Sequence, residues 1–475
     1  MTVNSSKFYE RKMRMKLKRK LLATGLALVM VLGTATSAFA WSSYQNGSDH
    51  NGVLDSAPVS VSTGFPKSDT LQYTGSGWSG VDNTPVMYKA TYTDASNNAS
   101  TKVLAYILYN GRSDGARLAC YDSATATELW NIQLNTSSKY QLSTPYLDEA
   151  NNCIYAASDG KVYKITNINT ESPSSTEIFA DANGEINTPI TKYGNYIYFG
   201  SWVSNGTVDG ATEPGSYYQL DTTSSTNACK EFQSTGARGF YWAGAYSDGN
   251  NVYFGGDDGR LYIRSVTNFN TSGSVVLLTD TLSAAGNVRS SIMAKTESGT
   301  TSLYFTSQGG YLWKYTIGAD SPLKYANIGS TSTSTPVMSD NGILYVGCYG
   351  TAVQGVRALA SSDFTANITS STDSKWKTVY ADTSSTATDK VQASVVAYSS
   401  IYYDEEAYED VAIDYVYFTT NASAGAGYCY SFVPSTGAAA SVWSTEGSTF
   451  TLQGMAGCDG YLVFGNDYNK VYFVK

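Results

Sequence analysis

A short sequence unit recurs along this chain, and it limits the folds that the chain can adopt. Its clearest copy runs from Ser334 to Gly350 and holds two β-runs, Pro336–Met338 and Ile343–Gly347, joined at Asp340-Asn341-Gly342. Asn and Gly tolerate the positive φ of a tight turn, so this copy predicts a β-hairpin. One unit used many times is typical of a repeat architecture. Similar copies begin at Ser143, Asn187 and Trp242.

Aligning the start of each copy identifies eight anchor positions, separated by 44 to 61 residues. Each anchor is followed by runs of strand length without helical periodicity between them. Units of this size, with four short strands each, predict the blades of a β-propeller. The copies at Arg289, Gln392 and Gln453 are weaker, so seven blades is the alternative if one of them is an insertion. The anchors are Asn83, Ser143, Asn187, Trp242, Arg289, Ser334, Gln392 and Gln453.

The last unit predicts how the ring closes. After Gln453 only three strands fit before the chain ends: Met455–Gly457, Tyr461–Phe464 and Lys470–Val474. We expect the missing fourth strand to be Leu71–Thr74, supplied from the N-terminal side, because pairing the two ends leaves no long exposed edge. The predicted fold is therefore all-β, an eight-bladed β-propeller closed by an N-terminal strand that completes the last blade.

Residues 1–40 have the pattern of a secretory signal peptide. Eight Lys or Arg lie among the first 20 residues, the apolar run Leu21–Leu32 follows, and Ala38-Phe39-Ala40 ends the segment. We expect cleavage after Ala40 and a secreted, extracellular protein, with retention at the cell surface as a further option. Residues 41–475 would then form a single propeller domain, expected to be a monomer without a membrane span.

The charge of the exported part disfavours two classes of partner. The chain has 31 basic and 40 acidic residues, and removing the eight basic and one acidic residue of the signal leaves a formal net charge of −16. Such a surface repels phosphate backbones and anionic lipids, so nucleic acid is not an expected partner.

One stretch carries a family resemblance. The segment Cys120-Tyr-Asp122-Ser-Ala-Thr125-Ala-Thr-Glu-Leu-Trp130 resembles the A-L-D-x-x-T-G-x-x-x-W signature of pyrroloquinoline-quinone-type repeat propellers, and Ser435-Thr436-Gly437 followed by Trp443 is similar. That family includes quinoprotein dehydrogenases and outer-membrane assembly propellers. The resemblance implies a propeller fold. Trp130, Trp376 and Trp443 precede or occupy the fourth strand of their units, and their large apolar area predicts that they wedge between neighbouring blades. The resemblance does not extend to the cofactor site, because the adjacent cysteines of the quinoproteins have no counterpart here, so no cofactor is predicted.

The remaining residues with catalytic or metal-binding side chains indicate structural roles. His50 is the only histidine, which excludes catalytic triads and multi-histidine metal sites built elsewhere, and we expect it to pack or hydrogen-bond. The carboxylates between Asp404 and Asp410 match no calcium-loop spacing and predict a solvated acidic loop, so no metal is expected. The six cysteines, 120, 153, 229, 348, 429 and 458, are expected to be buried free thiols.

The candidate site follows from propeller geometry. The first strand of each blade lines the central channel, so the anchors should meet around one mouth, where loops add further aromatic and basic side chains. Amide, guanidinium and aromatic groups around a concavity suit a polar organic ligand or a peptide. The alternative is that these groups only satisfy one another and channel water. The predicted ligand-binding residues are Trp242, Arg289, Gln392, Gln453, Asn83, Asn187, Trp78, Trp202, Arg238 and Tyr241.

These observations lead to two functional hypotheses. The first is a secreted, non-catalytic binding or scaffold propeller that recognises a protein, peptide or glycan at the channel mouth. The alternative is an extracytoplasmic enzyme, either a degenerate quinoprotein dehydrogenase or a glycan-cleaving propeller. A glycosidase needs two facing carboxylates, and only Glu185 and Asp82 are expected near the mouth.

Overall fold

The computed structural model describes residues 40–75, 79–136, 143–180, 184–203, 214–234, 239–350, 353–381, 390–405, 408–447 and 449–475. The predicted signal peptide, apart from Ala40, and the predicted site residues Trp78 and Arg238 lie outside these ranges. Within them the helices are short: α2 (Leu278–Thr281), η1 (Glu149–Asn151) and η2 (Ser361–Asp363). No helix in the described ranges has the length and apolar character needed to cross a membrane.

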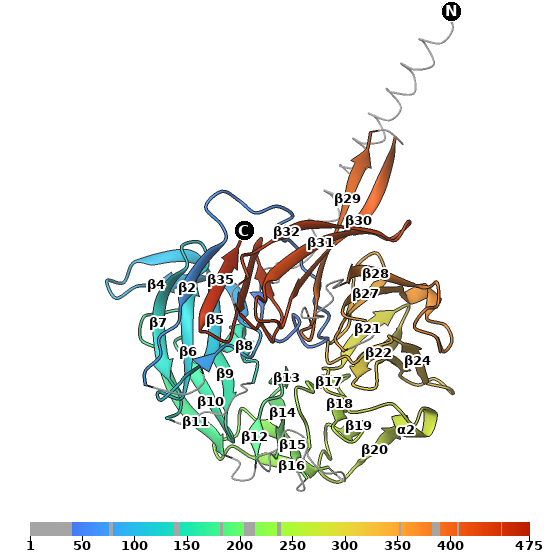
Figure 1. The fold of residues 1–475 in the computed structure, drawn as a ribbon. Coiled ribbons are helices and arrows are strands. Elements are labelled where there is room, and N and C mark those ends of the chain that lie inside the picture. Colours follow the sequence, from blue (N-terminus) through green and yellow to red (C-terminus); the bar gives the residue numbers. More distant parts are fainter. Residues whose placement is uncertain are drawn as a thin grey trace, which may run out of the picture. The chain divides into compact units, whose positions relative to one another are not determined.

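The described strands form eight antiparallel sheets that follow one another around a ring (Figure 1). The eight-bladed β-propeller predicted from the repeats is therefore confirmed. Blades 1 to 4 contain β1 (Ala40–Trp41), β3 (Ser79–Gly80), β4 (Val86–Thr93), β5 (Ala99–Gly111), β6 (Ala116–Asp122) and β7 (Thr127–Gln133); β8 (Tyr146–Asp148), β9 (Cys153–Ser158), β10 (Lys161–Thr166) and β11 (Ser174–Ala180); β12 (Glu185–Ile186), β13 (Thr191–Tyr193), β14 (Tyr196–Trp202), β15 (Ser216–Asp221) and β16 (Cys229–Gln233); and β17 (Tyr246–Ser247), β18 (Asn251–Gly256), β19 (Arg260–Ser265) and β20 (Gly273–Leu277).

The second half of the ring is built in the same way. Blades 5 to 8 contain β21 (Met293–Glu297), β22 (Thr300–Ser307), β23 (Tyr311–Thr316) and β24 (Leu323–Asn327); β25 (Val337–Met338), β26 (Ile343–Cys348), β27 (Gly355–Ala360) and β28 (Trp376–Ala381); β29 (Val396–Asp404), β30 (Glu409–Thr419), β31 (Gly427–Val433) and β32 (Ala438–Ser444); and β33 (Ala456–Cys458), β34 (Tyr461–Gly465), β35 (Lys470–Val474) and β2 (Lys67–Thr70).

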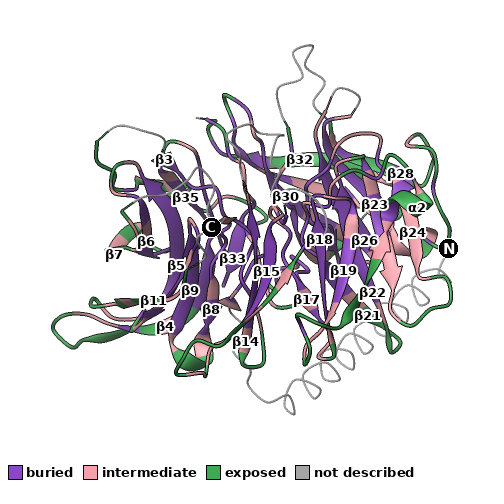
Figure 2. Ribbon diagram, turned by 90° about the horizontal axis from the view of Figure 1, so that it is seen from below, coloured by how far each residue is buried: buried purple, intermediate pink, exposed green. Residues whose placement is uncertain are grey.

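Burial follows the position of a strand within its blade (Figure 2). The second strand of blade 2, β9, is buried along its whole length, because both of its faces pack against neighbouring blades. The fourth strand of blade 3, β16, alternates between exposed and half-buried residues. The core therefore lies between the blades rather than in one central cluster.

The predicted wedge tryptophans lie in these interfaces. Trp130 of β7 is buried and donates its indole N–H to the carbonyl of Ile168, in the next blade, at 2.9 Å. Trp376 of β28 packs in one apolar cluster with Tyr304 of blade 5. Trp443 of β32 packs with residues of blade 8 and donates to the carbonyl of Pro58 at 3.0 Å. The structural role predicted for all three is confirmed.

An N-terminal strand does complete the last blade, but the predicted segment was wrong by four residues. The strand that pairs with β35 is β2, with Lys67 opposite Phe473 and Thr70 opposite Lys470. Its sequence, Lys-Ser-Asp-Thr, is polar because β2 is the outermost strand and half of its residues are exposed. Leu71–Thr74, which the sequence pattern favours, is the more apolar of the two segments.

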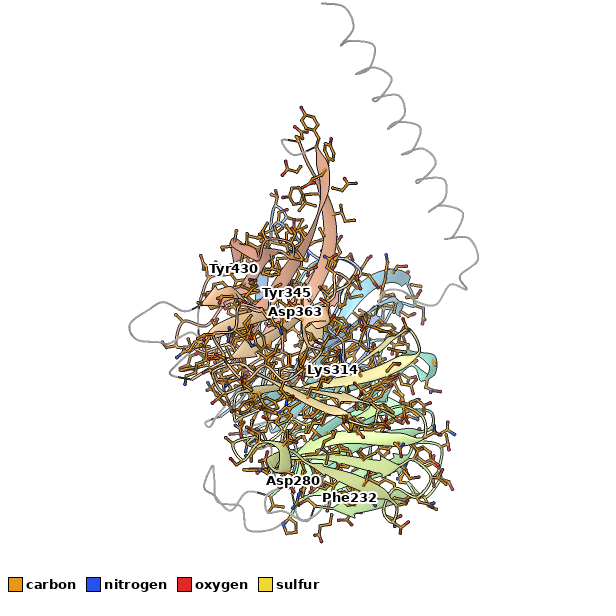
Figure 3. The ribbon with its side chains drawn as sticks, turned by 90° about the vertical axis from the view of Figure 1, so that its right-hand side faces the viewer. Phe232, Asp280, Lys314, Tyr345, Asp363 and Tyr430 are labelled. Atoms are coloured by element: carbon orange, nitrogen blue, oxygen red, sulfur yellow. The ribbon has the colours of Figure 1, made fainter. Side chains whose placement is uncertain are left out.

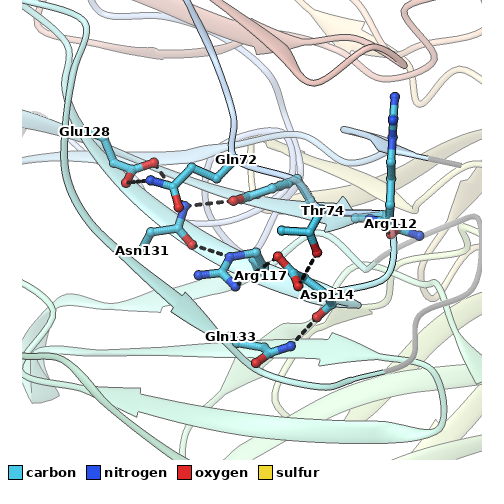
Figure 4. A network of polar contacts seen from close by, with 10 residues as sticks. Gln72, Thr74, Arg112, Asp114, Arg117, Glu128, Asn131 and Gln133 are labelled. Atoms are coloured by element: carbon cyan, nitrogen blue, oxygen red, sulfur yellow. Dashed lines mark hydrogen bonds and ion pairs between the residues drawn. The ribbon is translucent and has the colours of Figure 1, made fainter. Parts of the chain in front are cut away.

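The segment after β2 is tied to blade 1 instead (Figure 4). Thr74 donates its hydroxyl to Asp114 at 2.5 Å, and the Arg112 guanidinium lies 3.9 Å from the centre of the Tyr73 ring. Gln72 donates to Glu128 at 3.4 Å. The segment from Lys67 to Thr74 thus pairs with blade 8 and then bonds to blade 1, so it joins the last blade to the first.

Residues 40–54, here called the plug, run inside the ring of first strands. The plug begins as β1, which pairs with β4 of blade 1. The carbonyl of Ser42 accepts from the Leu147 N–H of blade 2 at 2.7 Å, and the carbonyl of Asp49 accepts from the Ala294 N–H of blade 5 at 2.8 Å. Asn51 exchanges hydrogen bonds of 2.8 and 3.1 Å with the backbone of Met338 in blade 6.

His50 anchors the middle of the plug. It is fully buried, with Nδ1 2.7 Å from the carbonyl oxygen of Tyr44 and Nε2 2.8 Å from that of Ala245 in blade 4. Thr191 of blade 3 lies 3.3 Å from the same Nε2. Burial lowers the pKa of His50, although the two carbonyl contacts oppose this. The expected packing and hydrogen-bonding role of His50 is confirmed.

The cysteines form no disulfide with one another, and five of the six are buried. Cys229 of β16 is exposed, so the expectation of buried free thiols is wrong at this position. It lies in the outermost strand of blade 3, where no further strand covers it.

Candidate functional site

A pocket lies at the channel mouth, on the face where the first strands begin. Its wall comes from residues that precede first strands, and its floor is Tyr44 of the plug. The pocket volume of about 10 Å³ leaves room for one water molecule. It is lined by Tyr44, Thr144, Asn187, Pro189, Trp242, Thr333, Gln392 and Gln453.

Four of the predicted site residues therefore meet at this pocket. Asn187 precedes β13, Trp242 precedes β17, Gln392 precedes β29 and Gln453 precedes β33. They come from blades 3, 4, 7 and 8, so the repeat brings together side chains that are up to 266 positions apart in the sequence. Asn83 occupies the same position in blade 1, where it is buried and donates its amide to the carbonyl of Leu108 at 2.7 Å.

The floor residue Tyr44 is held by blades 6 and 7. Its hydroxyl lies 2.5 Å from Ser394 Oγ and 3.4 Å from Thr335 Oγ1. Burial raises the pKa of Tyr44, while these two hydrogen bonds act in the opposite direction. The tyrosine thus stays neutral and closes the pocket from below.

Several polar atoms at this mouth make no hydrogen bond within the described residues. Both side-chain amide atoms of Asn187 are buried without a partner, as are the indole N–H of Trp242 and the side-chain carbonyl oxygen of Asn83. Buried polar groups are nearly always paired with protein or water. Asn187 is 1% exposed and lines the pocket, so a water molecule or a ligand group in the pocket is placed to pair with its amide.

Gln392 and Gln453 are partly committed to the protein. The side-chain oxygen of Gln392 accepts from the amide of Asn421. The backbone carbonyls of Gln392 and Gln453 accept from Thr333 at 3.0 Å and from Thr419 at 2.8 Å. These bonds hold the rim of the mouth in place.

Beside the pocket, Arg289 forms a buried ion pair with Asp257. Its Nε donates to Oδ1 at 2.9 Å and its Nη2 to Oδ2 at 2.7 Å, the two-point geometry of a strong charged pair. Trp202 donates to the same carboxylate at 3.2 Å. Burial alone would lower the pKa of Arg289, but the bonds to Asp257 outweigh burial and raise it. The pair therefore uses Arg289 as a structural support.

The Asp257–Arg289 ion pair also positions the ring of Tyr241 at the mouth. The Arg289 guanidinium lies 4.3 Å from the centre of the Tyr241 ring. The Tyr241 ring is 5.1 Å from Trp202 and 4.7 Å from Trp242. Burial raises the pKa of Tyr241. Four predicted residues thus form one cluster, here called the aromatic cluster: Trp202, Tyr241, Trp242 and Arg289.

Two carboxyl groups face each other at the junction of blades 8 and 1. Asp82 is 3% exposed and shares a hydrogen bond with Asp467. Burial, and then the charge of Asp467, raises the pKa of Asp82 well above its usual range, and burial raises the pKa of Asp467 to about 6. Carboxyl groups in such contact share a proton. They are closer than the separations of about 5 to 10 Å that glycosidases use.

The residues at the mouth do not fit a pyrroloquinoline quinone. Ligand pockets of that size class measure about 300 to 1,000 Å³, whereas the plug leaves a pocket of about 10 Å³ here. No two cysteines are adjacent in the sequence. Among the described residues no group of three or more His, Cys, Asp or Glu side chains could hold a metal ion.

Comparisons with known proteins identify the fold. No protein-family model matches the chain, and no curated protein matches it in sequence. Solved structures do resemble it. The quinohemoprotein alcohol dehydrogenase ADHIIG from Pseudomonas putida HK5 has a TM-score of 0.54 at 9% identity, over 92% of this chain and 80% of that one.

Two further solved structures share the architecture. A europium-containing methanol dehydrogenase has a TM-score of 0.50 at 10% identity, covering 90% of each chain. BamB from Moraxella catarrhalis has a TM-score of 0.49 at 12% identity, over 86% of this chain and 98% of that one. The likeness is one of fold. At the level of the fold, the two dehydrogenase structures agree with the predicted resemblance to quinone-type propellers.

Sequence reasoning missed two parts of the site. Asp257 precedes Asp258-Gly259, which the pattern identifies as a hairpin turn, and nothing local points to its partner Arg289. Tyr44 belongs to the opening segment, for which the sequence pattern predicts no site residue. Thr144, Pro189 and Thr333 flank the anchors, so their place at the mouth could have been predicted from the same alignment.

Proposed function

We propose that this chain is a non-catalytic binding or scaffold propeller that recognises a protein, peptide or glycan at the channel mouth. One observation carries the proposal: the Asn187 amide is buried in the mouth pocket with neither of its polar atoms paired within the described residues. A donor and an acceptor on one buried group match a ligand amide or hydroxyl, each of which can donate and accept.

The size of the pocket limits how a ligand would bind. Room for one water-sized group admits a single hydroxyl or one polar atom of a terminal amide, and the rest of the ligand would lie outside. The neighbouring aromatic cluster offers aromatic surface for that remainder at the half-buried Tyr241 and Trp242, whereas Trp202 is buried behind them. Aromatic rings beside amide groups suit stacking against a sugar ring or an aromatic side chain.

We further propose that the protein acts outside the cytoplasm, as a secreted or cell-surface monomer. The signal-like pattern of residues 1–40 and the acidic composition of the rest support this location. Outside the cytoplasm, the expected ligand is a group carried on an extracellular protein or glycan.

A glycan and peptide array probed with the full chain tests this proposal. We expect a defined set of ligands, each with a terminal hydroxyl or amide, to bind. Asn187→Leu should lower their affinity about tenfold or more, since it removes both pairing atoms. Asn268→Leu, at an exposed turn position, is the matched control and should bind as the unaltered chain does. If the Asn187→Leu variant binds these ligands as tightly as the unaltered chain does, the ligand binds elsewhere on the protein.

The enzymatic alternative has less support. Asp82 and Asp467 are in contact with each other, the Asp257 carboxylate is paired with Arg289, and the channel is filled by the plug. No observation favours a specific reaction.

A further inference from the structure

The first hairpin of blade 7 extends beyond its own sheet. Strands β29 and β30 pair from Val396 opposite Tyr417 to Asp404 opposite Glu409. The next strand, β31, pairs with β30 only from Asp414 to Thr419. The outer part of the hairpin therefore projects from the blade (Figure 1). Residues 400–405 and 408–413 are called the arm below.

The base of the arm is fixed firmly. Asp414 is fully buried, and its carboxylate accepts from Tyr345 at 2.6 Å, from Ser339 at 2.6 Å and from Ser399 at 2.7 Å. On the other face the rings of Tyr398 and Tyr415 stack, with centres 6.2 Å apart. The direction of the arm is thus set by the body of the propeller, from which the hairpin projects (Figure 3). The arm lies at the opposite end of β29 from Gln392, the residue of the channel mouth that precedes this strand.

The arm exposes large apolar side chains on both faces. Ile401 is 69% exposed and Tyr408 78%, with Tyr402 at 43% and Tyr403 at 40%. Side chains alternate between the two faces along a strand, so Ile401 and Tyr403 of β29 share one face of the hairpin and Tyr402 lies on the other. A two-stranded hairpin alone is marginally stable in water. Apolar groups gathered on a projecting element mark an interaction surface.

The charge of the arm identifies the kind of partner. Asp404, Glu405, Glu409 and Asp410 accompany the aromatic rings, and the sequence has no Lys or Arg between Val391 and Asn469. A second copy of the chain would bring like charges together, and an anionic lipid surface would be repelled in the same way. A cationic partner is attracted by the carboxylates, and its Lys or Arg side chains can lie over the tyrosine rings.

We propose that the arm docks a basic segment of a partner protein. Carboxylates at the tip steer and pair the cationic groups, and the exposed tyrosines cover their aliphatic stems. The expected occupant is a Lys- or Arg-rich surface segment, bound independently of any ligand at the channel mouth.

The test measures fluorescence anisotropy of a labelled peptide of alternating Lys and Ser residues with the full chain, at low salt. We expect binding that weakens as salt rises. Glu409→Lys with Asp410→Lys should weaken it about tenfold, and Tyr402→Ser with Tyr408→Ser about fivefold. The matched control is Glu297→Lys with Asp320→Lys, which reverses two exposed charges of blade 5 and leaves the arm intact. It should change affinity less than twofold.

Three outcomes would overturn the proposal. If the control variant weakens binding as much as the arm variants, the peptide recognises net charge alone. If the Tyr408→Ser chain, which alters one exposed tip residue, binds the peptide as the unaltered chain does, the tyrosines take no part. If sedimentation shows a dimer that the tyrosine changes dissociate, the arm binds a second copy instead.

Discussion

Asp257 and Arg289 organise the channel mouth through a single buried contact. The Asp257 side chain is 0% exposed and that of Arg289 11%, so the Asp257 charge is compensated by protein groups rather than by bulk water. The pair also supports Trp202 through its indole N–H and Tyr241 through its ring. These side chains therefore form a preorganised surface rather than four independent groups.

Replacing Arg289 by Met should destabilise the protein by about 3 kcal/mol, because it leaves the buried Asp257 carboxylate without the positive charge of its Arg289 partner. Urea unfolding measures the loss. The double variant Asp257→Asn with Arg289→Met should lose less than the single variant, since the uncompensated charge is gone. A double variant that is the less stable of the two would show that burial of the charge is not the cause.

The Asp82–Asp467 pair should make stability depend on pH. The pKa values of both carboxyls are raised in the folded state, that of Asp467 to about 6, so the folded protein holds the shared proton more tightly than the unfolded chain does. This contribution is complete below about pH 4 and is lost as pH rises through about 6, at a cost of about 2 kcal/mol.

Chemical denaturation at pH 5 and pH 7.5 measures this effect. Between pH 5 and pH 7.5 the Asp82→Asn variant should lose less free energy of unfolding than the unaltered protein does. The side-chain amide that this substitution introduces can donate to Asp467 at both pH values. Asp340→Asn, at an exposed turn, should keep the original pH dependence. A pH dependence unchanged by Asp82→Asn would contradict the shared proton.

At the level of elements, the N-terminal region performs two tasks. The plug fills the channel and contacts blades 1 to 7 through hydrogen bonds at or directly beside their first strands. The next stretch leaves the channel and supplies β2 to the outer edge of blade 8. Both parts contact residues that are distant in the sequence, so the N-terminal region holds the ring closed. It is called the clasp below.

Breaking the clasp at β2 should unfold the last blade. Asp69→Pro places a residue without an N–H opposite Val471 in the antiparallel ladder and should cost about 3 kcal/mol. Asp69→Ala, which removes only the bond from the Tyr121 hydroxyl at 3.1 Å, should cost about 1 kcal/mol. Thermal unfolding of the two variants compares them directly. Equal losses would mean that β2 contributes nothing through its backbone.

For the whole molecule, the repeat made the architecture predictable. Asn83-Thr84-Pro85 and Ser334-Thr335-Pro336 each precede a first strand, so eight such starts were enough to count the blades. The closing strand was misplaced because Lys67–Thr70 carries no apolar pattern at an exposed edge. Local pattern thus identifies the inner strands, which are buried, more reliably than the outer ones.

The site was less predictable because its geometry depends on contacts between blades. The repeat predicted that Asn187 and Trp242 approach one another, and the structure brings them to one pocket. It could not predict that Arg289 is paired with Asp257, nor that Tyr44 closes the channel. Both contacts depend on how the finished ring positions side chains that no local pattern relates.

Hydrogen–deuterium exchange with and without the highest-affinity array ligand tests the binding site at the mouth most directly. We predict protection of the segments that contain Asn187, Trp242, Gln392 and Gln453, together with Tyr44 of the plug. The arm should exchange equally in both states. Protection confined to the arm or to the outer strands, with no change around the channel mouth, would contradict the account.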